Sequence, residues 1–108
     1  MVDTETFRQM ALAFPGVNEE SHFHKTSFRV NKKIFATLDE AVRLAVVMLT
    51  PVDQDVFSSF DRSAIYPIPN KWGLKGSTYI ALDEVGEEIL NDALATAYNK
   101  VISKSKSK

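Results

Sequence analysis

The spacing of apolar residues changes from a helical to an alternating period early in the chain, and this change constrains the fold most. Between residues 7 and 14, apolar side chains recur at i, i+3, i+4 and i+7, which predicts an amphipathic helix. Asp3 is placed to cap this helix, and Pro15-Gly16 is placed to end it. From 27 to 38, apolar and polar residues alternate on both sides of Asn31-Lys32, a two-residue hairpin turn. The chain therefore begins with a helix followed by a β-hairpin.

The second half of the chain repeats this succession of strand and helix patterns. The apolar run Val42–Leu49 predicts a third strand that lies centrally in the sheet. A second helix begins at Thr50-Pro51, a hydroxyl cap followed by proline at the first helical position. We expect its buried face to consist of Val52, Val56, Phe57 and Phe60. Short strands at 64–68 and 77–82, a loop at 70–76 and a final helix capped by Asp83 complete the pattern.

These elements predict an α+β fold of two layers, with an antiparallel sheet of about five strands packed against helices. The expected order is α-β-β-β-α-β-β-α, with residues 17–21 as an acidic linker after the first helix. All of it fits one domain over residues 1–102, because domains usually hold roughly 100–150 residues. The Lys/Ser repeat at 103–108 cannot bury apolar surface, so we expect it to be a disordered tail.

Composition excludes several classes of function. The chain has no cysteine, so disulfides, thiolate metal sites and cysteine nucleophiles are excluded, and a reducing cytoplasm is the expected compartment. It has no apolar run long enough to cross a membrane. His22 and His24 lie two apart and can share a metal only with further ligands, for which the sequence offers only Glu19, Glu20 or a distant carboxylate. No nucleophile elbow or nucleotide-binding loop is present, so we predict no enzymatic activity, cofactor or metal.

Basic residues gather in the middle of the chain although the net charge is -1. Residues 21–75 carry eight basic and five acidic side chains, whereas residues 76–99 carry five acidic side chains and no basic one. Four of the cations belong to what we call the basic hairpin: Lys25, Arg29, Lys32 and Lys33. Cations on a projecting ribbon can contact phosphates without reading bases. The alternative is that lysines at hairpins and edge strands only guard against aggregation.

The single tryptophan, Trp72, lies in the predicted 70–76 loop between Lys71 and Lys75. A ring in a loop that contains two glycines can stack on a base or ligand, or fold back onto the core. We expect an intermediate arrangement, in which the ring packs by one face and leaves its edge at the rim of a shallow cleft beside the basic hairpin. The candidate nucleic-acid-binding residues are Lys71, Trp72, Lys75 and the four cations of the basic hairpin.

Several strings in the sequence resemble the MmcQ/YjbR-like family. They are Phe14-Pro15-Gly16, Glu19-Glu20-Ser21-His22-Phe23, the stretch from Ser27 to Ala36, Asn70-Lys71-Trp72-Gly73, Gly76-Ser77-Thr78 and Ala97-Tyr98. The resemblance spans nearly the whole chain. It implies a small, mostly bacterial, cytoplasmic protein with an α+β fold similar to secretion chaperones, without established catalytic residues.

The resemblance also implies DNA binding, because such proteins are often described as double-wing DNA-binding domains. We therefore expect a monomer that binds DNA non-specifically through phosphates. The alternative is a protein- or peptide-interaction domain that uses the sheet face or edge, as secretion chaperones do. Affinity that falls steeply with salt favours the first, and affinity nearly indifferent to salt favours the second.

Overall fold

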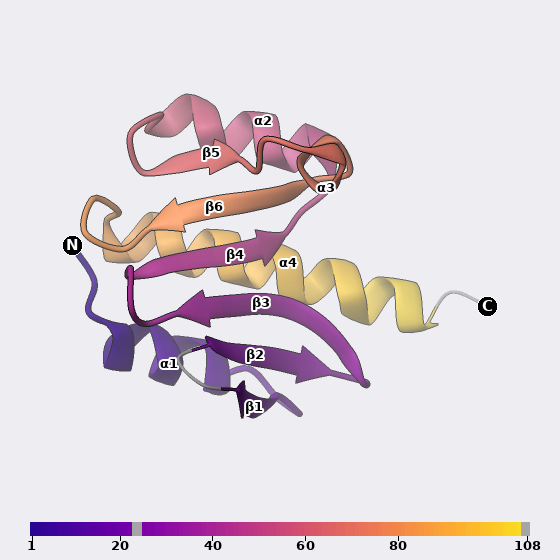
Figure 1. Cartoon of the computed structure of the whole chain (residues 1–108). Helices are drawn as coiled ribbons and strands as arrows, with labels where there is room; N and C mark the ends of the chain where they lie inside the picture. The colour runs from indigo at the N-terminus through magenta and orange to yellow at the C-terminus, as the bar shows by residue number, and fades with distance from the viewer. Residues whose placement is uncertain (23–24, 107–108) are drawn as a thin grey trace.

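The computed structural model describes the backbone of residues 1–22 and 25–106 and the side chains of residues 1–21 and 25–103. It contains one antiparallel sheet of six strands in the spatial order β1-β2-β3-β4-β6-β5 (Figure 1). The strands are β1 (Asn18–His22), β2 (Lys25–Val30), β3 (Lys33–Asp39), β4 (Leu44–Met48), β5 (Ile65–Pro67) and β6 (Ser77–Ala81).

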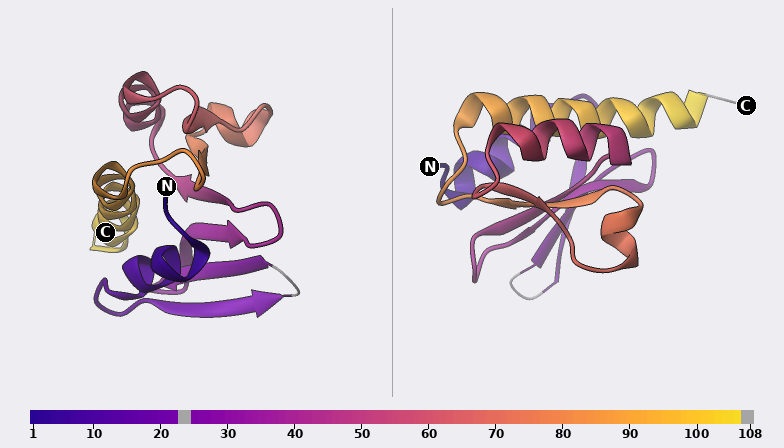
Figure 2. Two further views of the ribbon diagram at one scale, coloured as in Figure 1. Left: turned by 90° about the vertical axis from the view of Figure 1, so that its left-hand side faces the viewer. Right: turned by 90° about the horizontal axis from the view of Figure 1, so that it is seen from above.

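Three helices cover one face of this sheet. They are α1 (Thr4–Leu12), α2 (Pro51–Phe60) and α4 (Glu87–Lys106). The remaining helix, α3 (Lys71–Leu74), lies on the other side of the sheet, near the start of β6 (Figure 2). The α+β two-layer prediction is confirmed. None of the helices in the described part of the chain is long and apolar enough to span a bilayer.

Alternation along the strands builds the core between sheet and helices. Phe28 on β2 faces Ala36 on β3, and both are fully buried, as are Ala45 and Ile80 where β4 pairs with β6. Helix α4 contributes Leu90, Leu94 and Ala97 from one stripe to the same core. Residues that alternate with these on each strand point away from the helices.

The expected hairpin turn and central strand are both present. Asn31 and Lys32 have φ values of 52° and 67°, the left-handed pair that a type I′ turn requires. Strand β4 lies between β3 and β6, as the apolar run Val42–Leu49 predicts, although the strand itself covers only 44–48.

The segment between β4 and β6 leaves the end of β4 and returns to the same place. Met48 pairs with Ser77, and the Leu49 amide donates to the Gly76 carbonyl at 3.2 Å. Residues 49–76, which hold α2, β5 and α3, therefore form an excursion between two paired strands, and its strand β5 joins the sheet at the outer edge of β6.

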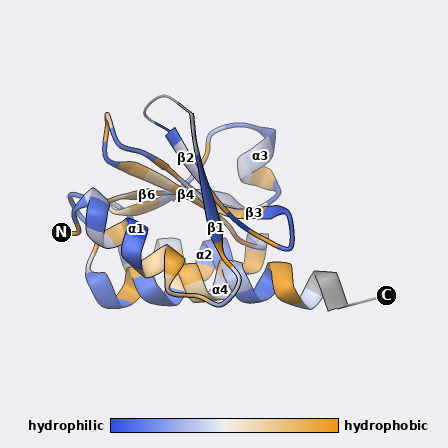
Figure 3. Cartoon of the chain, turned by 90° about the horizontal axis from the view of Figure 1, so that it is seen from below, coloured by the Kyte–Doolittle hydropathy of each residue, from blue (hydrophilic) through white to orange (hydrophobic). Residues whose placement is uncertain are grey.

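The residues expected to form an acidic linker instead form β1, which gives the sheet one strand more than the five expected. Its sequence is polar throughout (Figure 3), which hides it from any hydrophobic pattern. It pairs with β2 and is tied to α1 by Arg8, whose Nη2 lies 2.7 Å from a Glu19 carboxylate oxygen. This bond to Glu19 raises the pKa of the Arg8 guanidinium above its ordinary value.

The prediction of the buried face of α2 is wrong. Val52, Val56 and Phe60 are 73%, 50% and 72% exposed, and only Phe57 of the predicted face packs partly against the core. The buried residues are Gln54 and Ser58. Helical spacing shows which residues share a face, but not which way that face points.

The boundaries of α4 also differ from expectation. Asp83 does not cap it, because its carboxylate pairs with Arg43 and the chain turns through 82–85 before the helix begins at Glu87. The helix continues to Lys106, past the expected boundary at residue 102. Once packing of the apolar residues has nucleated the helix, adding each further residue costs little free energy, because each addition forms one more hydrogen bond. Residues 107 and 108 of the expected tail lie outside the described residues.

Candidate nucleic-acid interface

The face of the sheet that α1, α2 and α4 leave uncovered, here called the open face, has a polar half and an apolar half. Register and alternation place the polar side chains on β2 and β3: Lys25, Ser27, Arg29, Thr37 and Asp39. The apolar and aromatic side chains come from β4, β5 and β6: Leu44, Val46, Met48, Tyr66 and Tyr79. An aliphatic or aromatic side chain on an uncovered sheet face is available for contact with a ligand.

A small hollow of about 200 Å³ joins the two halves. Its apolar wall includes Val46, Ile68 and Tyr79, and Lys25 and Asp39 line it from β2 and β3. Ligand pockets for drug-sized molecules usually hold about 300–1,000 Å³. The hollow therefore suits one side chain or one base edge better than a whole cofactor.

The cations of β2 have nearby carboxylates. Arg29 donates from Nε to the Ser27 hydroxyl at 3.4 Å, and its Nη2 lies 3.5 Å from a Glu20 carboxylate oxygen. Lys25 is opposite Asp39 in the strand register. These neighbours orient the cations across the open face and reduce the net charge there.

Helix α3 is held in place by polar contacts and by a close approach of its backbone to that of Ile68. The Asn70 side chain accepts from the Trp72 amide at 2.8 Å and caps the helix. The Gln54 amide nitrogen donates to the Gly73 carbonyl at 2.9 Å and to the Ser77 carbonyl at 3.0 Å. A Cβ on Gly73 would lie 1.7 Å from the Ile68 carbonyl oxygen, so only glycine fits there.

This anchoring presents Trp72 to solvent. The residue is 56% exposed, and the Lys75 ammonium lies 5.5 Å from the ring centroid, within range of a cation–π contact. The expected position of the ring is the rim of a cleft beside the basic hairpin, but Trp72 does not line the hollow that Lys25 lines, and the expected 70–76 loop contains a short helix. The Gly76 φ of 117° then returns the chain to β6.

The structure brings the candidate residues together in two groups rather than one. Lys25 and Arg29 share the open face of β2, and α3 carries the other group, Lys71, Trp72 and Lys75. Strands β3 and β4 separate β2 from β6, which puts three strand spacings, about 14 Å, between β2 and the strand that follows α3.

The two other cations of the basic hairpin lie at its turn and not on the open face. Lys32 occupies the turn, and Lys33 pairs with Val30, whose side chain is buried on the helix side. The turn and α3 lie at the same end of the sheet (Figure 1), with β4 and β6 between them. The lining of the hollow includes Lys25 but not Trp72.

Sequence reasoning missed an aromatic pair on the open face. Tyr66 and Tyr79 face each other across β5 and β6, with ring centroids 5.6 Å apart and planes tilted by 56°. Tyr66 is 36% exposed. Alternation within 64–68 and 77–82 predicts which residues of each strand share a face. Only the pairing of the two strands shows that the two rings lie next to each other.

Metal ligands do not gather within the described residues, where no cluster of three or more His, Asp or Glu side chains is close enough to hold an ion. Of the two histidines weighed above, His24 and the side chain of His22 lie outside the described residues.

A sequence model of the YjbR family matches residues 12–100. The chain belongs to the YjbR family. Its fold is similar to the crystal structure of Deinococcus radiodurans protein DR2400, which carries the domain DUF419, with a TM-score of 0.81 and 21% identity. That similarity covers 97% of this chain and 82% of the other. No curated protein matches the sequence significantly.

Two of the strings that resemble the YjbR family meet in the fold. The Tyr98 ring stacks on Phe14 with centroids 4.9 Å apart, and its hydroxyl donates to the Pro15 carbonyl. These residues join the end of α1 to α4, on the side of the sheet away from the open face. Their role is therefore structural.

Proposed function

We propose that this YjbR-family chain binds single-stranded nucleic acid across the open face of its sheet. One observation carries the proposal: the uncovered face and α3 beside it combine cations with exposed aromatic rings. Proteins that bind single strands pair a basic track for the phosphates with rings on which bases stack.

The two groups of candidate residues divide this work. In this proposal Lys25 and Arg29 on β2 contact phosphates at one side of the open face, and Lys71 and Lys75 of the α3 group contact them at the other. Trp72 and Tyr66 offer rings of which 56% and 36% are exposed. Exposed rings favour a single strand over a duplex, because a paired base is already stacked within its helix.

The distribution of charge also favours the open face as the binding surface. The acidic residues of 83–92 lie at the start of α4 and just before it, on the helix-covered side. A net charge of -1 still predicts modest affinity that falls steeply with salt.

The hollow on the open face favours a second candidate, a peptide-binding domain. Its apolar wall can accept one side chain of an extended peptide. Addition of a strand at the sheet edge is disfavoured, because β5 has only three residues and includes Pro67, while β1 carries two glutamates. A peptide would therefore bind the face.

Fluorescence anisotropy with a labelled oligothymidylate tests the proposal. We expect affinity to fall with a log–log salt slope of about 0.7 for each phosphate contacted, and the matching duplex to bind more weakly. Trp72→Ala should weaken binding by about 1–3 kcal/mol, the contribution of one stacked base, and leave the melting temperature nearly unchanged.

A pair of charge variants supplies the control. Lys71→Ala with Lys75→Ala should reduce both affinity and salt slope, whereas Arg62→Ala, an exposed cation in the turn after α2, should change neither. An equal loss of affinity in the double lysine variant and in Arg62→Ala would contradict nucleic-acid binding through this face. An affinity that does not depend on salt concentration would contradict it as well. Salt-independent binding of peptides would support the second candidate.

A further inference from the structure

The apolar face of helix α2 points toward solvent rather than toward the core. Val52, Val56 and Phe60 follow one another at i, i+4 and i+8, and each is at least half exposed. The polar residues Gln54 and Ser58 face inward instead. An apolar stripe that no element of the described residues covers is typical of an interaction surface.

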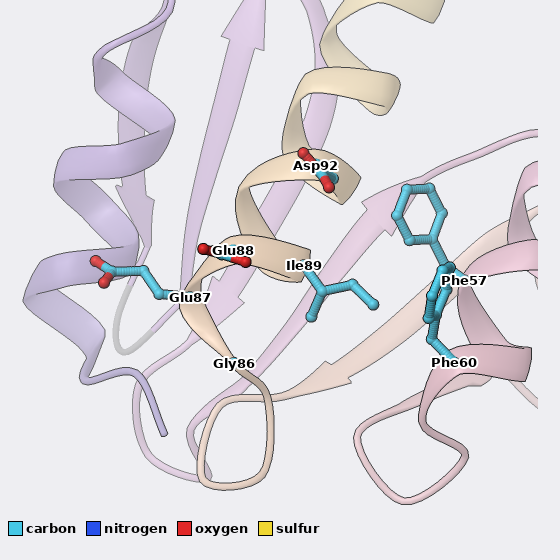
Figure 4. Close-up of a pocket in the computed structure, with 7 residues that line it drawn as sticks. All are labelled: Phe57, Phe60, Gly86, Glu87, Glu88, Ile89 and Asp92. Atoms are coloured by element: carbon cyan, nitrogen blue, oxygen red, sulfur yellow. The ribbon is translucent and has the colours of Figure 1, made fainter.

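Phe60, the last residue of the stripe, lines a groove between α2 and α4, which run side by side on the covered side of the sheet (Figure 2). The groove has a volume of about 580 Å³. Ile89 of α4 extends toward Phe57 and Phe60 of α2, and these three side chains form its apolar floor (Figure 4).

Carboxylates line the α4 side of this groove. Glu88 and Asp92 lie one turn apart along α4, and Glu87 points toward α1 (Figure 4). Within the described residues, none of the three forms an ion pair. The surface thus combines an apolar floor with an acidic ridge.

We propose that this groove binds a basic amphipathic helix of another protein. Two helices side by side seat a third in the groove between them, with anchors at i, i+3, i+4 and i+7. The ten residues of α2 span about 15 Å, which fits roughly three turns of the bound helix. Its apolar anchors would cover Phe57, Phe60 and Ile89, while its lysines or arginines would meet Glu88 and Asp92.

A second copy of this chain is a poorer occupant. A twofold dimer through this surface brings the same patch of both copies into one interface, so the acidic ridges of both copies would lie in it together. Like charges brought together at an interface disfavour association. The acidic ridge therefore selects a basic partner.

Binding of a designed peptide to the full chain tests the inference. The probe is a fluorescein-labelled helix of about fourteen residues, with leucines along one face and lysines on the other. We expect Phe60→Ser and Asp92→Lys each to weaken its binding by about tenfold or more. A peptide of the same composition in scrambled order should bind about tenfold more weakly than the helix.

Two matched variants on other surfaces serve as controls. Leu74→Ser removes a side chain of α3 that is 81% exposed, and Glu40→Lys reverses an exposed charge in the β3–β4 turn. Both should leave affinity unchanged. Since Phe60 is 72% exposed, Phe60→Ser should keep the wild-type melting temperature.

Equal losses from the controls, or equal binding of the scrambled peptide, would overturn the inference. A wild-type chain that self-associates in sedimentation and becomes monomeric on Phe60→Ser would assign the groove to a second copy and overturn it as well. The oligothymidylate assay concerns the opposite side of the sheet, so the two proposals succeed or fail separately.

Discussion

Gln54 shows how one side chain positions a candidate binding element. It is buried on α2, and its amide nitrogen donates to the carbonyls of Gly73 and Ser77. Those carbonyls belong to α3 and to the first residue of β6. One amide thereby fixes the position of α3, and with it the Trp72 ring, relative to the sheet.

Replacing Gln54 should therefore be costly. Gln54→Leu leaves two inward-facing carbonyls without their donor, and we expect it to lower the free energy of unfolding by about 1–3 kcal/mol. Gln54→Glu should be worse at neutral pH, because an ionised carboxylate cannot donate and would face two carbonyl oxygens. Urea unfolding of the two variants measures the difference. A Gln54→Glu protein as stable as wild type at pH 7 would show that these bonds do not hold α3.

At the scale of elements, the sequence predicted those whose hydrophobic pattern is decisive. The hairpin around Asn31-Lys32, the central strand within Val42–Leu49 and the apolar stripe of α4 follow from periodicity and turn chemistry alone. Strand β1 could not be found this way, because its stability comes from pairing with β2 and from Arg8 rather than from buried apolar side chains.

The candidate site was predictable to a similar degree. Trp72 and its flanking lysines stand out as a cationic segment around the only tryptophan, but their separation from β2 depends on strand order, which periodicity does not give. The pairing of Tyr66 with Tyr79 and the outward face of α2 depend likewise on tertiary arrangement.

Helix α3 depends on a glycine that no other residue can replace. We expect Gly73→Ala to displace α3 or unfold its single turn, since the new Cβ would lie 1.7 Å from the Ile68 carbonyl oxygen. The protein should melt at a lower temperature, and the Trp72 emission spectrum should shift. Gly86→Ala is the matched control, because a Cβ there meets nothing within 4 Å. Equal melting temperatures for the two variants would show that α3 has room to move.

At the scale of the whole molecule, the excursion at 49–76 suggests uneven stability. Strands β2, β3 and β4 each have a partner on both sides, whereas β5 pairs only with β6 and α3 is one turn long. Elements with few neighbours open at lower free energy than the core. In native-state hydrogen exchange, amides of β5 and α3 should therefore exchange before those of β3 and β4. Uniform protection across all four elements would contradict this division.

The two ends of the sheet have a consequence for the protein at high concentration. An exposed strand edge is a template onto which another chain can add, and repeated addition leads to fibrils. Here one edge is a three-residue strand that ends in proline and the other is a polar strand bearing two glutamates. Neither edge offers the flat, apolar row of amides on which such growth proceeds, so we expect the fold to resist polymerisation through its strand edges.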